Sequence, residues 1–271
     1  MSDEKDYILG THDEEIARLG LQHRVWRPRA LDAWRRAGFT VGQTLMDIGC
    51  GPGYASVDLA EIVGSSGQVV AIDRSRRFLD ALNGVCAQRG VQNIIPFERD
   101  LAEEDLPVSG IDGAWARWVF AFVNRPRRLL ERVHSVLKPG GVFVLHEYID
   151  YSTWRVAPRS PEIEDFVRVV MESWRADGGE PDIGLDLPLW LQELGFEIKA
   201  LNQIIDVIPA TNFVWQWPRT FLRVGLQRLT DLGRLTPEKA EGVKRAFDAC
   251  EARPGSLLIT PTVLEIIAVR S

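Results

Sequence analysis

The sequence is poor in cysteine and histidine and has no long apolar run. Its 271 residues include only three cysteines and four histidines. The cysteines, at positions 50, 86 and 250, have neither the spacing of a zinc site nor that of a secreted disulfide framework. No apolar stretch approaches the ~20 residues that a membrane-spanning helix needs. We therefore expect a cytoplasmic protein in a reducing compartment, with no membrane span and no metal site.

Excess positive charge is also absent, because the formal net charge is −6. Nucleic-acid-binding domains usually carry a basic face, so we expect no nucleic-acid partner. The first six residues are mostly charged, which is unlike a secretory signal peptide. Hydrophobic residues make up 45% and charged residues 26%, as in ordinary globular proteins. The length allows one large domain with a cap.

The most informative stretch lies between residues 44 and 62. Apolar residues 44–48 predict the end of a buried strand, and residues 55–62 predict a helix. Three glycines lie between them, at positions 49, 51 and 53. Strand, glycine turn and helix open a nucleotide-binding unit, where glycine lets the backbone turn tightly or a ligand approach. A dinucleotide fingerprint would need a third glycine where this chain has Tyr54.

Asp47 and the three glycines form the pattern Asp-x-Gly-x-Gly-x-Gly, which resembles motif I of the class I S-adenosylmethionine (SAM)-dependent methyltransferases. The resemblance implies an α/β, Rossmann-like sheet of seven strands, mostly parallel. Outside the part that it covers, the chain predicts N-terminal helices and a helical, aromatic-rich cap. The resemblance also implies that SAM is the cofactor. An acid beside the loop suits the cationic amino-acid tail of SAM. We expect Asp47, Gly49 and Gly51 to contact it.

Further positions match the family in the same order along the chain. Asp73 ends the predicted strand 68–73, where the resemblance implies a ligand for the two ribose hydroxyls, and Arg74 is expected along the adenine. Asp100 matches the carboxylate that accepts from the adenine amino group, and Leu101 would offer its backbone N–H. Arg117 ends the predicted strand from residue 111 and matches the position whose backbone contacts the methionine amino group.

The predicted strand 142–148 carries polar residues at its tip, where an acceptor site would place a base. His146 is one candidate base, and the alternative is a histidine hydrogen-bonded between the strand and the cap. Trp118 and Tyr148 are expected to border the methyl-transfer site. Residues 137–141 read Leu-Lys-Pro-Gly-Gly, which resembles the family's turn before strand five.

Residues 1–40 predict helices over the cofactor site. Thr11 and Glu14 form a capping box for the first helix, and Tyr7 and Gly10 belong to a leader found in some small-molecule methyltransferases. Pro28 predicts the start of a second helix over 29–36. In the first helix, Arg18 and Gln22 share a face with Glu15. That face either reaches the methionine carboxylate or is simply solvated.

The predicted methyltransferase domain covers residues 41–208 and 257–271, with strands at 196–208 and 257–269. Two inserts, 149–182 and 209–256, are expected to form the cap. The second insert is rich in aromatic residues, and Trp215 is a candidate for the acceptor pocket. Aromatic residues there either pack the cap down or line a pocket for a flat, apolar substrate.

Residues 40–148 carry most of the resemblance, and their motifs are most similar to those of ubiquinone/menaquinone-type and natural-product methyltransferases. The implied activity is methyl transfer from SAM to a small aromatic or apolar acceptor. The Asn/Asp-Pro-Pro-Tyr/Phe motif of many nucleic-acid and protein methyltransferases is absent after the fourth strand. One alternative is a non-catalytic, SAM-binding regulatory or scaffolding protein. A weaker one, an NAD-dependent oxidoreductase, conflicts with Tyr54.

Overall fold

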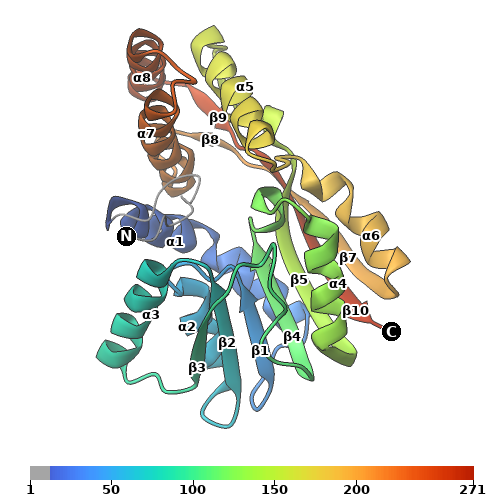
Figure 1. Ribbon diagram of the computed structural model, residues 1–271. Helices are drawn as coiled ribbons and strands as arrows, with labels where there is room; N and C mark the ends of the chain where they lie inside the picture. The colour runs from blue at the N-terminus through green and yellow to red at the C-terminus, as the bar shows by residue number, and fades with distance from the viewer. Residues whose placement is uncertain (1–12) are drawn as a thin grey trace.

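The computed structural model describes residues 13–271, and its centre is a seven-stranded sheet with strand order β3-β2-β1-β4-β5-β10-β7 (Figure 1). The strands are β1 (Thr44–Ile48), β2 (Gln68–Asp73), β3 (Ile94–Glu98), β4 (Ile111–Arg117), β5 (Leu137–Asp150), β7 (Phe196–Ile204) and β10 (Thr262–Arg270). Strands β1 to β5 pair in parallel, whereas β10 runs antiparallel to both β5 and β7. The predicted sheet, mostly parallel with one antiparallel strand, is confirmed.

Helices cover both faces of this sheet. One face packs against α1 (Asp13–Arg36), α2 (Tyr54–Val63) and α3 (Arg76–Arg89), and the other against α4 (Pro126–Val136) and α6 (Leu187–Glu193). Successive side chains of β1 point to opposite faces of the sheet. Leu45 packs with α1 and α2, whereas Met46 packs with α4. The helix α3 ends at Gly90, whose positive φ of 67° closes it in the left-handed conformation.

The N-terminal region is one continuous helix rather than two. Pro28 lies inside α1, so the prediction of a second helix starting there is wrong. Proline removes only one helical hydrogen bond, and the buried residues Trp26, Ala30 and Trp34 anchor the helix on both sides of it. Tyr7, Gly10 and Thr11 lie outside the described residues.

A cap stands at the carboxyl ends of the parallel strands (Figure 1). Its helices are α5 (Pro161–Ala176), α7 (Gln216–Asp231) and α8 (Pro237–Ala252). A separate three-stranded sheet of β6 (Arg155–Ala157), β9 (Leu257–Ile259) and β8 (Val207–Pro209) joins them. Short 3-10 turns complete the chain at Phe120–Phe122, Tyr151–Thr153, Ile183–Leu185 and Phe213–Trp215.

The small cap sheet was not predicted. Each of the expected strands 196–208 and 257–269 is broken, and one piece of each crosses into the cap as β8 or β9. Pro261 interrupts the second strand because it has no N–H to donate. The first break holds Asp206, whose backbone N–H donates to Thr260 Oγ1 (3.0 Å) and whose carboxylate pairs with Arg29 of α1 (2.7 Å).

Candidate functional site

A cavity opens between the carboxyl ends of the strands, the helix α1 and the cap. Its walls are formed by Glu15, Arg18, Leu19, Gln22, His23, Asp47, Gly49, Cys50, Tyr54, Ala55, Asp73, Arg74, Arg99, Asp100, Leu101, Ala102, Glu103, Trp115, Arg117, Trp118, Val119, Phe122, Val123, Asn124, Tyr148, Trp174 and Phe221. Most of the residues predicted from the sequence motifs therefore meet around one space, although they come from elements far apart in the chain. The crevice at the carboxyl ends of the strands is the usual ligand position in such sheets.

Asp47 is the acid at the floor of this cavity. It is buried near the end of β1, and its Oδ2 accepts a hydrogen bond of 2.6 Å from Ser56 Oγ on α2. Burial raises the pKa of Asp47 to about 7, and this outweighs the opposing effects of the Ser56 bond and of nearby Arg117. A cationic ligand group would favour the ionised form, so the position suits an ammonium.

Asp73 holds the glycine loop together as well as facing the cavity. Its Oδ2 accepts from the backbone N–H of Gly51 and its Oδ1 from that of Ser75, both at 2.8 Å. Burial raises the pKa of Asp73, and the two backbone bonds oppose that rise. Each carboxylate oxygen can accept more than one hydrogen bond, so the residue can still receive ribose hydroxyls.

The glycines of the loop are required mainly by the protein's own packing. A Cβ at Gly49 would lie 2.5 Å from Val119, and one at Gly53 would lie 2.2 Å from Leu82. The positive φ of Gly51 (54°) is a further reason for glycine. Gly49 does line the cavity, but Gly51 is not among its wall residues. The N–H of Gly51 donates to Asp73, and contact of Gly51 with the cofactor stays a prediction.

The loop after β3 supplies the far end of the cavity. Asp100, Leu101 and Arg74 all line it, as the sequence motifs imply for the adenine. Asp100 Oδ1 accepts from the N–H of Ala102 (2.9 Å), which fixes the turn. Arg132 of α4 donates to the carbonyl of Leu101 (3.1 Å) and supports the same turn from behind.

Arg18 and Gln22 also line the cavity, but Arg18 is already bonded to both Gln22 and Glu15. Arg18 donates through Nε and Nη2 to the two carboxylate oxygens of Glu15, at 2.7 and 2.6 Å. Its Nη1 donates to Gln22 Oε1 at 2.8 Å. All three side chains are buried, so the alternative of a solvated helix face is wrong. The Arg18 guanidinium lies 6.0 Å from the ring of Phe221 on the cap.

His23 and Asp58 are wall and support residues that sequence reasoning missed. His23 Nε2 lies 2.9 Å from Asp58 Oδ2 on α2, and Nδ1 lies 3.4 Å from Arg117 Nη2. Burial lowers the pKa of His23 despite its bond to Asp58, which favours the neutral ring at pH 7. No sequence motif marks the pair, because 35 positions separate its members.

Aromatic side chains form the wall beneath the cap. The ring of Trp118 stacks on Tyr148 at 5.3 Å, with 15° between the planes. Trp174 of α5 contacts Phe122 edge-on at 4.7 Å, and Phe221 of α7 closes the same wall. These five residues line the cavity and are hereafter called the aromatic wall. Trp215 was expected here, but it is fully buried beside Phe247 of α8, at 5.7 Å, and lies off the cavity.

The backbone at Trp118 has an unusual conformation. Its φ is +53°, the one positive value among the non-glycine residues of 13–271. The carboxylate of Glu147 accepts from the next two N–H groups, of Val119 (2.7 Å) and Phe120 (2.9 Å). Burial raises the pKa of Glu147 to about 7, although these bonds oppose the rise. Glu147 therefore positions the strained turn that carries Trp118 into the aromatic wall.

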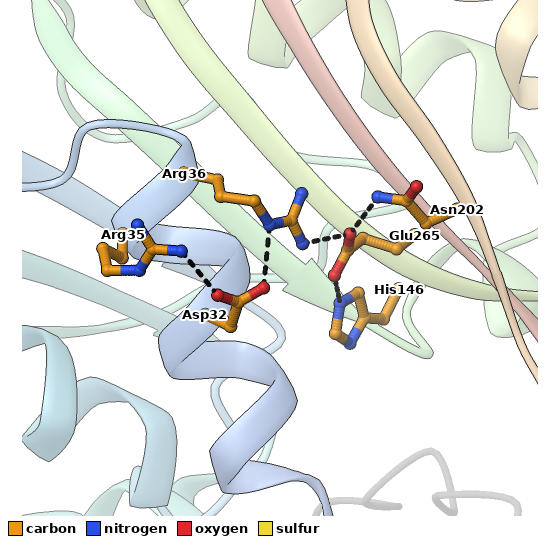
Figure 2. A network of polar contacts seen from close by, with 6 residues as sticks. All are labelled: Asp32, Arg35, Arg36, His146, Asn202 and Glu265. Carbon is orange, nitrogen blue, oxygen red and sulfur yellow. Dashed lines mark hydrogen bonds and ion pairs between the residues drawn. The ribbon is translucent and has the colours of Figure 1, made fainter.

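His146, predicted as a base, does not reach the cavity. It is fully buried on β5 between Trp26 and Trp115, and its Nε2 lies 3.1 Å from Glu265 Oε2 on β10. Figure 2 shows Glu265 between His146, Arg36 and Asn202. The placement as a substrate-facing base is wrong because side chains alternate along a strand, and residue 146 faces α1. It joins two strands rather than the strand and the cap.

Glu265 is the centre of this network. Burial alone would raise its pKa, but hydrogen bonds from His146, Asn202 and Arg36 hold it at about 2. Burial lowers the pKa of His146 more than Glu265 raises it. An ionised carboxylate is thus held beside a neutral imidazole that donates to it. The network links the C-terminal end of α1 to β5, β7 and β10.

Within residues 13–271, no cluster of three or more His, Cys, Asp or Glu side chains has the geometry to hold a metal ion. Over the same range, no helix is both long and apolar enough to cross a membrane.

Comparison with known proteins shows that the chain is similar to methyltransferases. Residues 45–141 match the family model described as "Methyltransferase domain". The 2-phytyl-1,4-naphtoquinone methyltransferase of Synechococcus elongatus is 28% identical over 156 residues, which are 56% of this chain and 61% of that protein. The demethylmenaquinone methyltransferase of Staphylococcus aureus is 32% identical over 46% of this chain and 50% of its own length. The chain thus spans less than two thirds of these relatives.

Solved structures agree on the fold. A putative methyltransferase from Bacillus halodurans superposes with a TM-score of 0.60 at 16% identity, covering 89% of this chain and 98% of that one. A putative sarcosine dimethylglycine methyltransferase from Galdieria sulphuraria gives 0.59 at 14% identity, covering 90% and 84%. Domain match and strand order lead to one conclusion: residues 45–141 form a methyltransferase domain, and the chain has the fold of the class I SAM-dependent methyltransferases.

Proposed function

We propose that the protein transfers a methyl group from SAM to a small, flat aromatic acceptor of the quinone type. One observation carries the proposal: a single cavity joins the acids of the SAM motifs to an aromatic wall. A donor site and an acceptor site must share one space, because the methyl group passes directly between them.

The donor end fits the groups of SAM by its chemistry. Asp47 offers a buried carboxylate to the ammonium, Asp73 offers acceptors to ribose hydroxyls, and Asp100 lines the part expected to hold adenine. The Nη1 atom of half-buried Arg117 has no hydrogen-bond partner within residues 13–271 and offers a donor to the carboxylate. When bound, SAM supplies a methyl group already activated by its sulfonium. The protein has mainly to orient the acceptor, which can lower a barrier by about 7–11 kcal/mol.

The acceptor end favours a planar, apolar ring. The aromatic wall offers ring faces and edges to stack against, and such contacts favour other aromatic rings. The names of the two relatives above state naphthoquinone and menaquinone precursors as their acceptors, which supports a quinone-type ring here. The cap helices α5 and α7 contribute Trp174 and Phe221 and limit the access of water.

The direct test is turnover of purified protein with SAM and a panel of reduced quinones, phenols and amines, read as S-adenosylhomocysteine formed. We expect product with a reduced naphthoquinone or another flat phenolic ring. Binding of SAM without product from any member of the panel would favour the non-catalytic alternative. Binding of NAD with no affinity for SAM or S-adenosylhomocysteine would refute the donor assignment.

A further inference from the structure

Arg117 is a half-buried cation on the cavity wall, and no acid within residues 13–271 forms an ion pair with it. Its Nη1 is buried and has no hydrogen-bond partner among residues 13–271. Its Nη2 has one long contact, 3.4 Å to His23 Nδ1. Burial lowers the pKa of Arg117 to about 10, so it remains charged at neutral pH. Its guanidinium also lies over the rings of Trp115 (5.8 Å) and Trp118 (5.3 Å), which offer no hydrogen-bond acceptor. A buried donor atom without an acceptor is costly, and a ligand could supply the missing acceptor.

Arg18, the cation first expected to reach the methionine carboxylate, is already satisfied. Its guanidinium is bonded through three nitrogens to Glu15 and Gln22. It also lies beside Phe221 of the aromatic wall. Its partners and its position both assign Arg18 to the acceptor end rather than to the donor end.

Arg117 lies beside Asp47 at the strand tips. The strands β1 and β4 are neighbours, and Ile48 at the end of β1 pairs with Ala116 of β4. Arg117, the next residue of β4, therefore lies beside the end of β1. The charges of Asp47 and Arg117 attract each other across the cavity without forming an ion pair. An acid and a cation held apart in this way match a zwitterion, with ammonium on one and carboxylate on the other.

We propose that the guanidinium of Arg117, rather than that of Arg18, binds the methionine carboxylate of SAM. This inference rests on the proposed function for its ligand. The backbone contact that the sequence motif implies for position 117 is compatible with this proposal. The backbone can contact the methionine amino group while the side chain binds the carboxylate. His23, held by Asp58 at 2.9 Å, restrains the guanidinium from the other side.

The test compares two ligands by calorimetry. One is S-adenosylhomocysteine, and the other is its decarboxylated analogue, which keeps the ammonium. The proteins are wild type, Arg117→Met, Arg117→Lys and the matched control Arg18→Met. Wild type should prefer S-adenosylhomocysteine. Arg117→Met should lower that affinity about 10- to 100-fold, as for lost bonds between charged groups, and leave the analogue within about twofold. Arg117→Lys should keep part of the preference, and Arg18→Met should keep all of it.

Thermal unfolding without ligand gives a second readout. Arg117→Met removes a cation that has no ion pair and whose buried Nη1 lacks an acceptor, so its melting temperature should not fall. A lower melting temperature with an unchanged preference between the ligands would make Arg117 structural and overturn the inference. If only Arg18→Met loses the preference for S-adenosylhomocysteine, Arg18 rather than Arg117 binds the methionine carboxylate. An unchanged preference in both variants, with weaker binding of a phenolic acceptor to Arg117→Met, would assign the guanidinium to the acceptor. Wild type that binds neither ligand would refute the proposed function itself.

Discussion

At the scale of single residues, the site contains two carboxylic acids whose pKa values burial raises to near neutral pH. Asp47 and Glu147 both have pKa values raised to about 7 by burial. Asp47 faces the cavity, whereas Glu147 supports the turn beside it. An acid whose charged form is disfavoured in the free protein can gain that charge when a cationic ligand arrives. Ligand binding and protonation are therefore expected to be linked.

The affinity for SAM should rise with pH. Because the ammonium of SAM prefers ionised Asp47, affinity should increase between about pH 5.5 and pH 7 and level off above the pKa of about 7. Calorimetry in buffers of different ionisation enthalpy should detect proton release at pH 6. Asp47→Asn should weaken SAM about 10- to 100-fold at pH 8 and remove this proton release. A full pH dependence in that variant would assign the titration to another group.

The same raised pKa has the opposite consequence for the stability of the ligand-free protein. The folded state binds the Asp47 proton more tightly than the unfolded chain does, so this contribution to stability is complete below the unfolded pKa of about 4. It is lost as pH rises toward 7. Urea titrations from pH 5 to 8 should show a smaller decrease in unfolding free energy for Asp47→Asn than for wild type. Equal decreases would show that Asp47 is not buried as described.

Asp73 should have two separable roles. Asp73→Ala removes the acceptor for the N–H groups of Gly51 and Ser75, so we expect lost SAM affinity together with about 1–3 kcal/mol of lost stability. Asp73→Asn keeps one side-chain oxygen and should lose less stability. Intact stability in Asp73→Ala would mean that the loop does not need these bonds.

At the scale of elements, the His146–Glu265 network fixes α1 against the sheet, and α1 is a wall of the cavity. His146→Ala should lower the unfolding free energy by about 1–3 kcal/mol, the usual cost of removing one partner of a buried hydrogen bond. Turnover per folded molecule should stay nearly unchanged, since His146 lies off the cavity. The partly exposed His134 of α4 offers a matched control, and His134→Ala should lose less stability. A normal melting temperature with a much lower kcat would restore His146 as a base.

The cap elements should affect the acceptor and leave SAM affinity unchanged. Phe221→Leu keeps most of the buried volume but removes a ring from the aromatic wall. We expect the KM for an aromatic acceptor to rise about 3- to 10-fold, by about the worth of one aromatic contact. Phe213→Leu is the control, because Phe213 is 51% exposed and off the cavity. Equal KM changes in both variants would remove the cap from the acceptor site.

The elements of the Rossmann-like sheet could be predicted from the sequence more accurately than those of the cap. The strand predicted at 44–48 and the helix predicted at 55–62 are observed as β1 and α2, because hydrophobic spacing and the glycine turn mark them locally. The tip residues Asp47, Asp73 and Asp100 could be placed because parallel strands end at one edge. The direction of His146, the satisfied state of Arg18 and the His23–Asp58 pair depend on contacts between distant elements. Neither periodicity nor a motif records such contacts.

At the scale of the whole molecule, the account requires one ligand to span the strand tips and end at the cap. The most direct measurement is a crystal structure with S-adenosylhomocysteine. We predict its adenosine between Asp73 and Asp100, its amino-acid end between Asp47 and Arg117, and its sulfur directed toward Trp118 and the rest of the aromatic wall. A ligand whose adenosine lies against the aromatic wall, or whose sulfur points away from the cap, would contradict the account.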